Sequence, residues 1–156
     1  MSSDLKAQFN ARTDEIEKLV ADLTEAQAAL APAAGEWCIR EVLTHLSGDA
    51  SQTFHDGLKR FVKEETPDIG LTPGESYAEG REGLPIDALA KGVVAQYREI
   101  ANWAGALSPD DLARTARIPF LKETPLGETP TLQVWLGAIL SFHLPQHIEQ
   151  LQKLRG

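Results

Sequence analysis

Two histidines, His143 and His147, lie four residues apart in the segment 141–150 near the C-terminus. On an α-helix each residue turns by about 100° and rises by about 1.5 Å, so their imidazoles would lie roughly 40° apart and one turn from each other. At this spacing two histidines on one helix can bind the same metal ion. Because a metal site usually takes at least three protein ligands, another element would have to supply the third.

The last predicted helix begins at Thr131 and carries this pair in the middle of its apolar face. The apolar positions of this helix are Leu132, Trp135, Leu136, Ile139, Leu140, Phe142, Leu151 and Leu154. Gln146 and Gln150 fall within reach of the two histidines on the same helix face. Glu149 points largely away from them at ideal helical angles, so we do not expect it to be a ligand.

Pro145 lies between the two histidines. A proline inside a helix removes one backbone hydrogen bond and clashes with the carbonyl four residues earlier, which here belongs to Ser141. We therefore expect either a kink at this point or one helix that ends near Ser141 and another that starts at Leu144. The histidines should remain one-turn neighbours in both cases.

A third histidine, His45, lies on the segment 36–65, which the apolar spacing predicts to be one long helix. Its apolar positions are Ile39, Val42, Leu43, Leu46, Ala50, Phe54, Leu58 and Phe61. His45 falls on the flank of this stripe, beside Cys38 and Asp49. A flank residue can line a cleft between two helices or lie at the surface. His55 falls away from the stripe, and we expect it at the solvated surface.

Four long amphipathic helices without an alternating strand pattern predict an all-α bundle, with residues 1–156 forming a single domain. The other predicted elements are a first helix from Asp4 to Leu23, a short helix from Thr24 to Leu30, a third long helix from Pro85 to Leu107, a turn capped by Ser108, and a loop at 118–130. The stretch 66–85 holds three prolines and four glycines and is expected to be irregular. A loop of this length suggests a functional lid, a partner-binding loop or a mobile segment.

The composition limits the classes of function. The chain has 156 residues, 42% of them hydrophobic, and a formal net charge of -8. This charge argues against nucleic acid or an anionic membrane as a partner, because both need a basic face. The apolar runs are too short for a membrane span, and no basic-then-apolar leader opens the chain. A single cysteine excludes an intrachain disulfide, and we expect a cytoplasmic protein.

Two stretches resemble the DinB-like superfamily. Glu36-Trp-Cys-Ile-Arg-Glu-Val-Leu-Thr-His45-Leu is similar to the tryptophan-containing start of that family's second helix, and His143-Leu-Pro-Gln-His147-Ile-Glu-Gln150 to its C-terminal histidine pair. The resemblance covers essentially the whole chain and departs at Pro145. It implies a four-helix up-down-down-up bundle with a long loop between the second and third helices. It also implies a divalent metal ion, commonly zinc or nickel, held by His45, His143 and His147, and a homodimer.

Several residues near these histidines could have either of two roles. Asp49 could orient the ring of His45, and Gln146 or Gln150 the rings of the other pair, but Asp49 could equally face solvent. Trp37 could wall the cleft, although a tryptophan at a helix start is more often in the core. Cys38 is expected to be a small buried residue rather than a ligand or nucleophile.

The resemblance implies a metal-dependent enzyme that activates a low-molecular-weight thiol, such as mycothiol, bacillithiol or glutathione, or activates water as a hydrolase. The sequence has no cluster of arginines typical of binding a polyanionic cosubstrate, although Arg81, Arg98 and Lys122 could contribute to binding an anionic one. Two alternatives remain open: a non-enzymatic, stress-associated metal- or ligand-binding bundle, and a dimerisation module with an empty site. A lone histidine on an apolar face is more often a core residue than a ligand.

Overall fold

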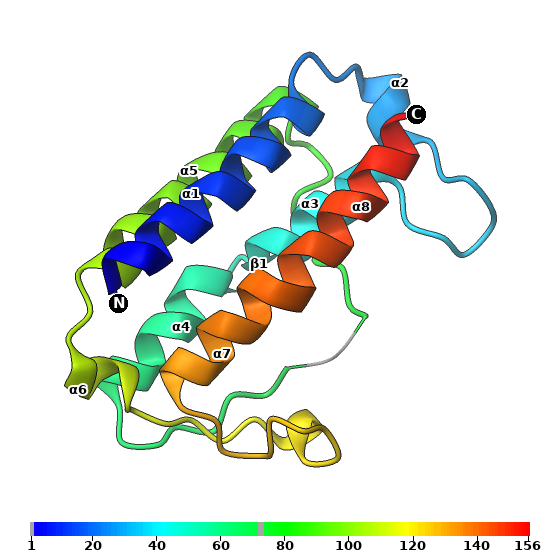
Figure 1. The fold of residues 1–156 in the computed structure, drawn as a ribbon. Helices are drawn as coiled ribbons and strands as arrows, with labels where there is room; N and C mark the ends of the chain where they lie inside the picture. Colours follow the sequence, from blue (N-terminus) through cyan, green and yellow to red (C-terminus); the bar gives the residue numbers. More distant parts are fainter. Residues whose placement is uncertain (1, 72–73) are drawn as a thin grey trace.

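The computed structural model describes residues 2–71 and 74–156, which form a bundle of long helices (Figure 1). The bundle consists of α1 (Ser2–Val20), α3 (Ile39–Ser47) followed by α4 (Phe54–Lys63), α5 (Ile86–Gly105), and α7 (Leu132–Ala138), which continues through the π-helical turn η2 (Ile139–His143) into α8 (Leu144–Arg155). Shorter helices are α2 (Glu25–Ala29), α6 (Pro109–Leu112) and the 3-10 turn η1 (Pro119–Leu121). None of the described helices is long and apolar enough to cross a membrane.

The long helices run up, down, down and up in chain order (Figure 1). α1 rises, α3 and α4 descend, α5 descends again after the long loop, and α7 with α8 rises to the C-terminus. α1 packs along α5, α3 packs against both α5 and α8, and α8 closes the bundle against α1. The predicted all-α bundle with this topology is confirmed.

Local sequence signals set most of the helix ends. Thr24, Ser108 and Thr131 each accept a hydrogen bond from the backbone N–H three residues later, and so cap α2, α6 and α7. The cap at Ser108 was predicted, as were the helix starts at Thr24 and Thr131. The apolar faces meet in one core, whose largest fully buried side chains include Tyr97, Phe9, Phe61, Ile16, Ile39 and Leu43. The Tyr97 hydroxyl is satisfied inside this core by donating to the carbonyl of Leu46 at 3.0 Å.

The prediction of one continuous helix over 36–65 is wrong. α3 ends at Ser47, and a tight hairpin of β1 (Gly48–Asp49) and β2 (Gln52–Thr53) separates it from α4. Gly48 has φ +80°, and a Cβ at this position would lie 2.6 Å from the backbone nitrogen of Phe54. Only glycine fits this turn without strain. Periodicity alone missed the break, because apolar residues continue at helical spacing on both sides of it.

The helix adapts to Pro145 without separating into two helices. η2 makes a π-helical turn over Ile139–His143, and Pro145 then lies in the first turn of α8. Because a proline nitrogen has no hydrogen to donate, a local widening of the hydrogen-bond ladder is a low-cost way to pass it. Such π turns within α-helices often occur at functional sites.

The predicted irregular stretch 66–85 has no helix within its described part. It is nevertheless anchored, because Ile69 is only 3% exposed and its N–H donates to the carbonyl of Arg117 at 2.8 Å. The N–H of Arg117 in turn donates to the carbonyl of Pro67 at 2.8 Å. The loop therefore lies against the segment that precedes α7, on the side of the bundle where the histidines meet.

Candidate metal centre

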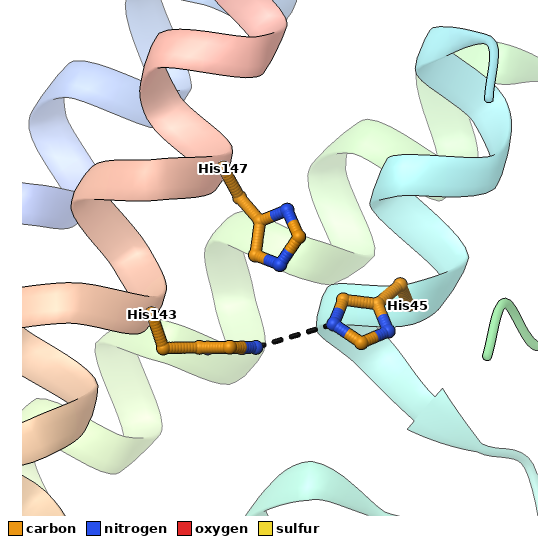
Figure 2. Close-up of side chains that lie close together, drawn as sticks. All are labelled: His45, His143 and His147. Atoms are coloured by element: carbon orange, nitrogen blue, oxygen red, sulfur yellow. Dashed lines mark hydrogen bonds between the residues drawn. The ribbon is translucent and has the colours of Figure 1, made fainter. Parts of the chain in front are cut away.

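His45, His143 and His147 converge in the fold (Figure 2). His45 comes from the last turn of α3, His143 ends η2, and His147 lies one turn later on α8. The Nε2 atoms of His45 and His143 lie 3.2 Å apart, and one nitrogen from each of the three rings lies within 4.8 Å of the others. The helical spacing of the pair and the flank position of His45 therefore do bring three imidazoles to one point.

In two of the rings, the nitrogen that faces away from the cluster makes a hydrogen bond, and this bond determines which nitrogen is left without a proton. The Nδ1–H of His45 donates to the carbonyl of Glu75 at 2.6 Å, and the Nδ1–H of His147 donates to Oε1 of Gln150 at 2.9 Å. Each bond leaves a lone pair on Nε2, directed toward the other rings (Figure 2). An outer hydrogen bond of this kind is the usual second-shell support of a metal-binding histidine.

Burial keeps the rings of His143 and His147 neutral. Burial, followed by the nearby His147 and His45, lowers the pKa of His143 to about 3. Burial also lowers the pKa of His147, against the opposing effect of its bond to Gln150. Neutral imidazoles are the form that binds a metal ion.

The donor set fits a cation. Two Nε2 atoms at 3.2 Å that both present lone pairs would repel unless a proton or a cation lies between them. Nδ1 of His143 is buried and has no hydrogen-bond partner among the described residues. Imidazole nitrogens suit zinc, nickel, copper and iron, and three of them leave at least one position open for a further ligand.

The histidines line a cavity of about 1170 Å³ between α3, α4, α8 and the long loop. Trp37 forms part of its wall, with its ring 5.1 Å from that of His45 and stacked at 6.4 Å on that of His147. Phe54 stacks on His143, with ring centroids 5.8 Å apart and an interplanar angle of 9°. Trp37 therefore combines the two roles considered for it, because it packs against the core and also walls the cavity beside two of the histidines.

Of the polar residues expected to orient the histidines, one does so and the others do not. Gln150 orients His147 as predicted, whereas Gln146 lines the cavity without a hydrogen bond to a described histidine. Asp49 does not orient His45, because its carboxylate instead accepts from the N–H and hydroxyl of Ser51, both at 2.8 Å. Glu149 lies at the cavity but outside the histidine cluster.

Sequence reasoning missed the group that does orient His45. The carbonyl of Glu75 belongs to the long loop, thirty residues away in the chain. A backbone acceptor leaves no residue-type signal, so only the unusual length of the loop pointed to this region. The loop thus contributes directly to the site.

Two further residues are buried as side chains of the core. Cys38 is buried as predicted, and burial raises the pKa of its thiol, which disfavours the thiolate needed for ligation or attack. The surface prediction for His55 is wrong: this residue is 9% exposed and packs edge-on against Trp103 at 5.4 Å. The break at Gly48 explains the error, because it turns α4 relative to the continuous helix that was assumed.

The cationic side chains considered for a cosubstrate lie elsewhere. Arg98 pairs with Asp14 at 2.6 Å and also with Asn10 and Glu17, all on α1. Among the described residues, neither Arg81 nor Lys122 lines the cavity. None of the three therefore supports binding of an anionic cosubstrate in this cavity.

The fold and site define a helical bundle with three histidines from two facing helices at one cavity. A model of the DinB superfamily matches residues 8–151, and the chain belongs to this superfamily. YfiT from Bacillus subtilis, described as "a probable metal-dependent hydrolase with an unusual four-helix bundle topology", aligns with a TM-score of 0.68 at 20% identity, over 98% of this chain and 85% of that one.

Relatives at the sequence level carry a similar name. A protein of Oceanobacillus iheyensis named "Putative metal-dependent hydrolase" is 27% identical over 139 residues, which cover 88% of this chain and 78% of the relative. A protein of Bacillus cereus with the same description is 27% identical over 141 residues, covering 90% and 79%. The similarity therefore extends over most of each protein.

Proposed function

We propose that this protein is a metal-dependent enzyme that binds a divalent cation, zinc or nickel, through Nε2 of His45, His143 and His147. The observation that carries the proposal is the convergence of three imidazoles, two of them held by outer hydrogen bonds that leave Nε2 free. The relatives named as metal-dependent hydrolases support it from an independent side. A structural role for the metal is disfavoured, because such sites are usually closed by four protein ligands.

We place hydrolysis first among the reactions, because it is the activity in the names of the relatives. A divalent cation at this position would lower the pKa of a bound water molecule or thiol toward neutrality and so supply a nucleophile. The chain itself keeps His143 and His147 in their neutral form, braces the cluster with Trp37 and Phe54, and provides a cavity for the substrate. Transfer to a low-molecular-weight thiol would use the same residues.

Metal content tests the site. Protein produced without chelators should contain about one equivalent of zinc or nickel, measured by elemental analysis. His45→Ala, His143→Ala and His147→Ala should each lose it, whereas His55→Ala should keep it because His55 lies outside the cluster. Wild-type protein with less than about a tenth of an equivalent, even after incubation with zinc or nickel, would refute the site.

Activity separates the enzyme from a non-enzymatic metal-binding bundle. The metal-loaded protein should hydrolyse members of a panel of ester and amide substrates or transfer a thiol in a parallel panel. The three cluster variants should abolish this activity and His55→Ala should retain it. Full metal content without turnover in either panel would favour the binding protein.

A further inference from the structure

We infer that the cavity selects substrates with an apolar body and no negative charge away from the reacting group. This inference names a substrate class for the site and rests on the proposed function. It follows from two features of the cavity wall, its charged side chains and its apolar and aromatic side chains.

The charged side chains at the cavity, other than the histidines, are mostly acidic. They are Asp49, Glu75, Glu149 and Lys153. Lys153 is the one cation among the described lining residues, and it is paired with Glu149 at 3.1 Å. Among the described lining residues, Asp49 and Glu75 are the two carboxylates without an ion pair, and we call them the acidic pair.

The acidic pair is held in place by its surroundings. Hydrogen bonds from the N–H and hydroxyl of Ser51 lower the pKa of Asp49, so this carboxylate is ionised at neutral pH. The backbone carbonyl of Glu75 is fixed by His45, which ties this residue to the metal-binding ring. Within the described chain, neither carboxylate is within 4.0 Å of a basic nitrogen.

Two groups near the acidic pair do not reverse its charge. Tyr77 lines the cavity, and burial followed by Glu75 and Asp49 raises the pKa of its phenol, which keeps it neutral. Arg81 is close enough to help lower the pKa of Asp49 and so offsets part of its charge, and its guanidinium also donates to the carbonyl of Tyr77 at 2.7 Å. Arg81 is not among the described residues that line the cavity.

Apolar and aromatic side chains make up much of the remaining wall, which also includes uncharged polar residues such as Gln52 and Gln146. The apolar and aromatic side chains facing the cavity include Trp37, Phe54, Leu71, Phe120, Trp135 and Ile139. An aromatic wall favours an apolar or ring-containing substrate body, because it gains by removing that body from water. A bound divalent cation would attract negative charge at the reacting group, so the two carboxylates are expected to act on the far end of the substrate, where they favour a neutral or cationic group over an anionic one. Glutathione, which carries two carboxylates, is therefore a poor match for this cavity.

A matched pair of probes tests the inference. Para-(mercaptomethyl)benzamide and para-(mercaptomethyl)benzoate share a thiol and a ring and differ in the charge of the far group. Binding to metal-loaded protein can be followed by tryptophan fluorescence, because Trp37 and Trp135 line the cavity. We expect the benzoate to bind roughly fivefold to twentyfold more weakly than the amide, from repulsion by two partly solvated carboxylates.

Variants assign this difference to the acidic pair. In Asp49→Asn/Glu75→Gln the ratio of the two dissociation constants should fall below about twofold, because the repelling charges are gone. The asparagine keeps an oxygen for Ser51, and the bond from His45 uses the backbone of Glu75. The control Glu15→Gln/Asp110→Asn removes the same net charge from exposed positions on α1 and α6 and should leave the ratio unchanged. Added salt should reduce the ratio in wild-type protein.

Three results would overturn the inference: no saturable binding of the amide, benzoate binding as tight as that of the amide, or a ratio that the double variant does not change. Metal content measured on the same samples reports on the proposed function separately. Full metal content without charge discrimination would refute only this inference. Charge discrimination in protein that binds no metal would refute only the proposed function.

Discussion

The chain buries histidines in two different settings. His143 and His147 share one space with His45, and three ring nitrogens there lie within 4.8 Å of one another. His55 is buried alone, with its ring against Trp103 and its Nε2 without a hydrogen-bond partner among the described residues. Burial lowers the pKa in both settings, so burial and a shifted pKa do not by themselves indicate a metal ligand. The difference lies in the convergence of the three rings and in the outer hydrogen bonds that two of them, His45 and His147, make.

A short structural element separates the two settings. On one continuous helix, His45 and His55 would be ten residues apart and their side chains would point about 80° from each other, which places them on neighbouring faces. The hairpin at Gly48 instead ends α3 at Ser47, two residues after His45, and a new helix starts just before His55. His45 then faces α8, and His55 packs against Trp103 of α5. The break therefore assigns one histidine to the cavity and the other to the core.

The largest expected effect concerns metal-dependent stability. At a zinc concentration about a thousandfold above its dissociation constant, the wild-type fold should gain about 4 kcal/mol, because the ion binds the folded chain. His143→Leu should lose this gain, whereas His55→Leu should retain it, since only the first removes a converging nitrogen. Thermal unfolding with and without zinc measures both variants. If zinc stabilised both variants equally, His143 would contribute no more to metal binding than His55 does.

The break itself can be tested at Gly48. We expect Gly48→Ala to lower the free energy of unfolding by about 3 kcal/mol, because φ +80° is strained for a residue with a Cβ and that atom would meet the backbone of Phe54. Gly57→Ala is a matched control, since a Cβ there meets nothing within 4 Å. Urea denaturation of the two variants gives the comparison. A Gly48 variant as stable as the control would mean that the turn does not require glycine.

The outer hydrogen bond of His147 should matter less than a ligand but still measurably. Gln150→Leu removes the acceptor that holds Nδ1–H and should weaken metal binding by about 10-fold to 100-fold. Gln146→Leu is the control, because Gln146 lines the same cavity without bonding a described histidine. Competition with a chelator of known affinity measures both constants. Equal losses in the two variants would indicate a general effect of polarity at the cavity rather than orientation of the ring.

These comparisons also show what sequence could and could not predict. The all-α bundle followed from helical periodicity and caps, and the pairing of His143 with His147 from their spacing. The topology and the addition of His45 to this pair followed from the resemblance to the DinB-like superfamily. The hairpin was missed because a single glycine with positive φ leaves no trace in an apolar pattern. The role of Glu75 was missed because a carbonyl of the main chain is common to every residue type. The homodimer and the ligand assignment remain predictions.

The smallest effect is expected at His55, and its sign is fixed by burial. Burial is the main cause that lowers the pKa of His55, followed by Lys59, while Glu99 and Asp56 act in the opposite direction. The unfolded chain therefore binds a proton at His55 more readily than the folded chain does. The contribution of His55 to the free energy of unfolding should be fully present above a pH of about 6.5 and should decrease as the pH falls below it. His55→Leu should flatten the wild-type pH profile of unfolding free energy between pH 6.5 and the lower pKa of the folded state. The comparison should be made in metal-loaded protein, so that the other histidines contribute equally to both profiles. Identical profiles for His55→Leu and wild type would mean that the buried ring titrates as it does in the unfolded chain, and that burial does not disfavour its charged form.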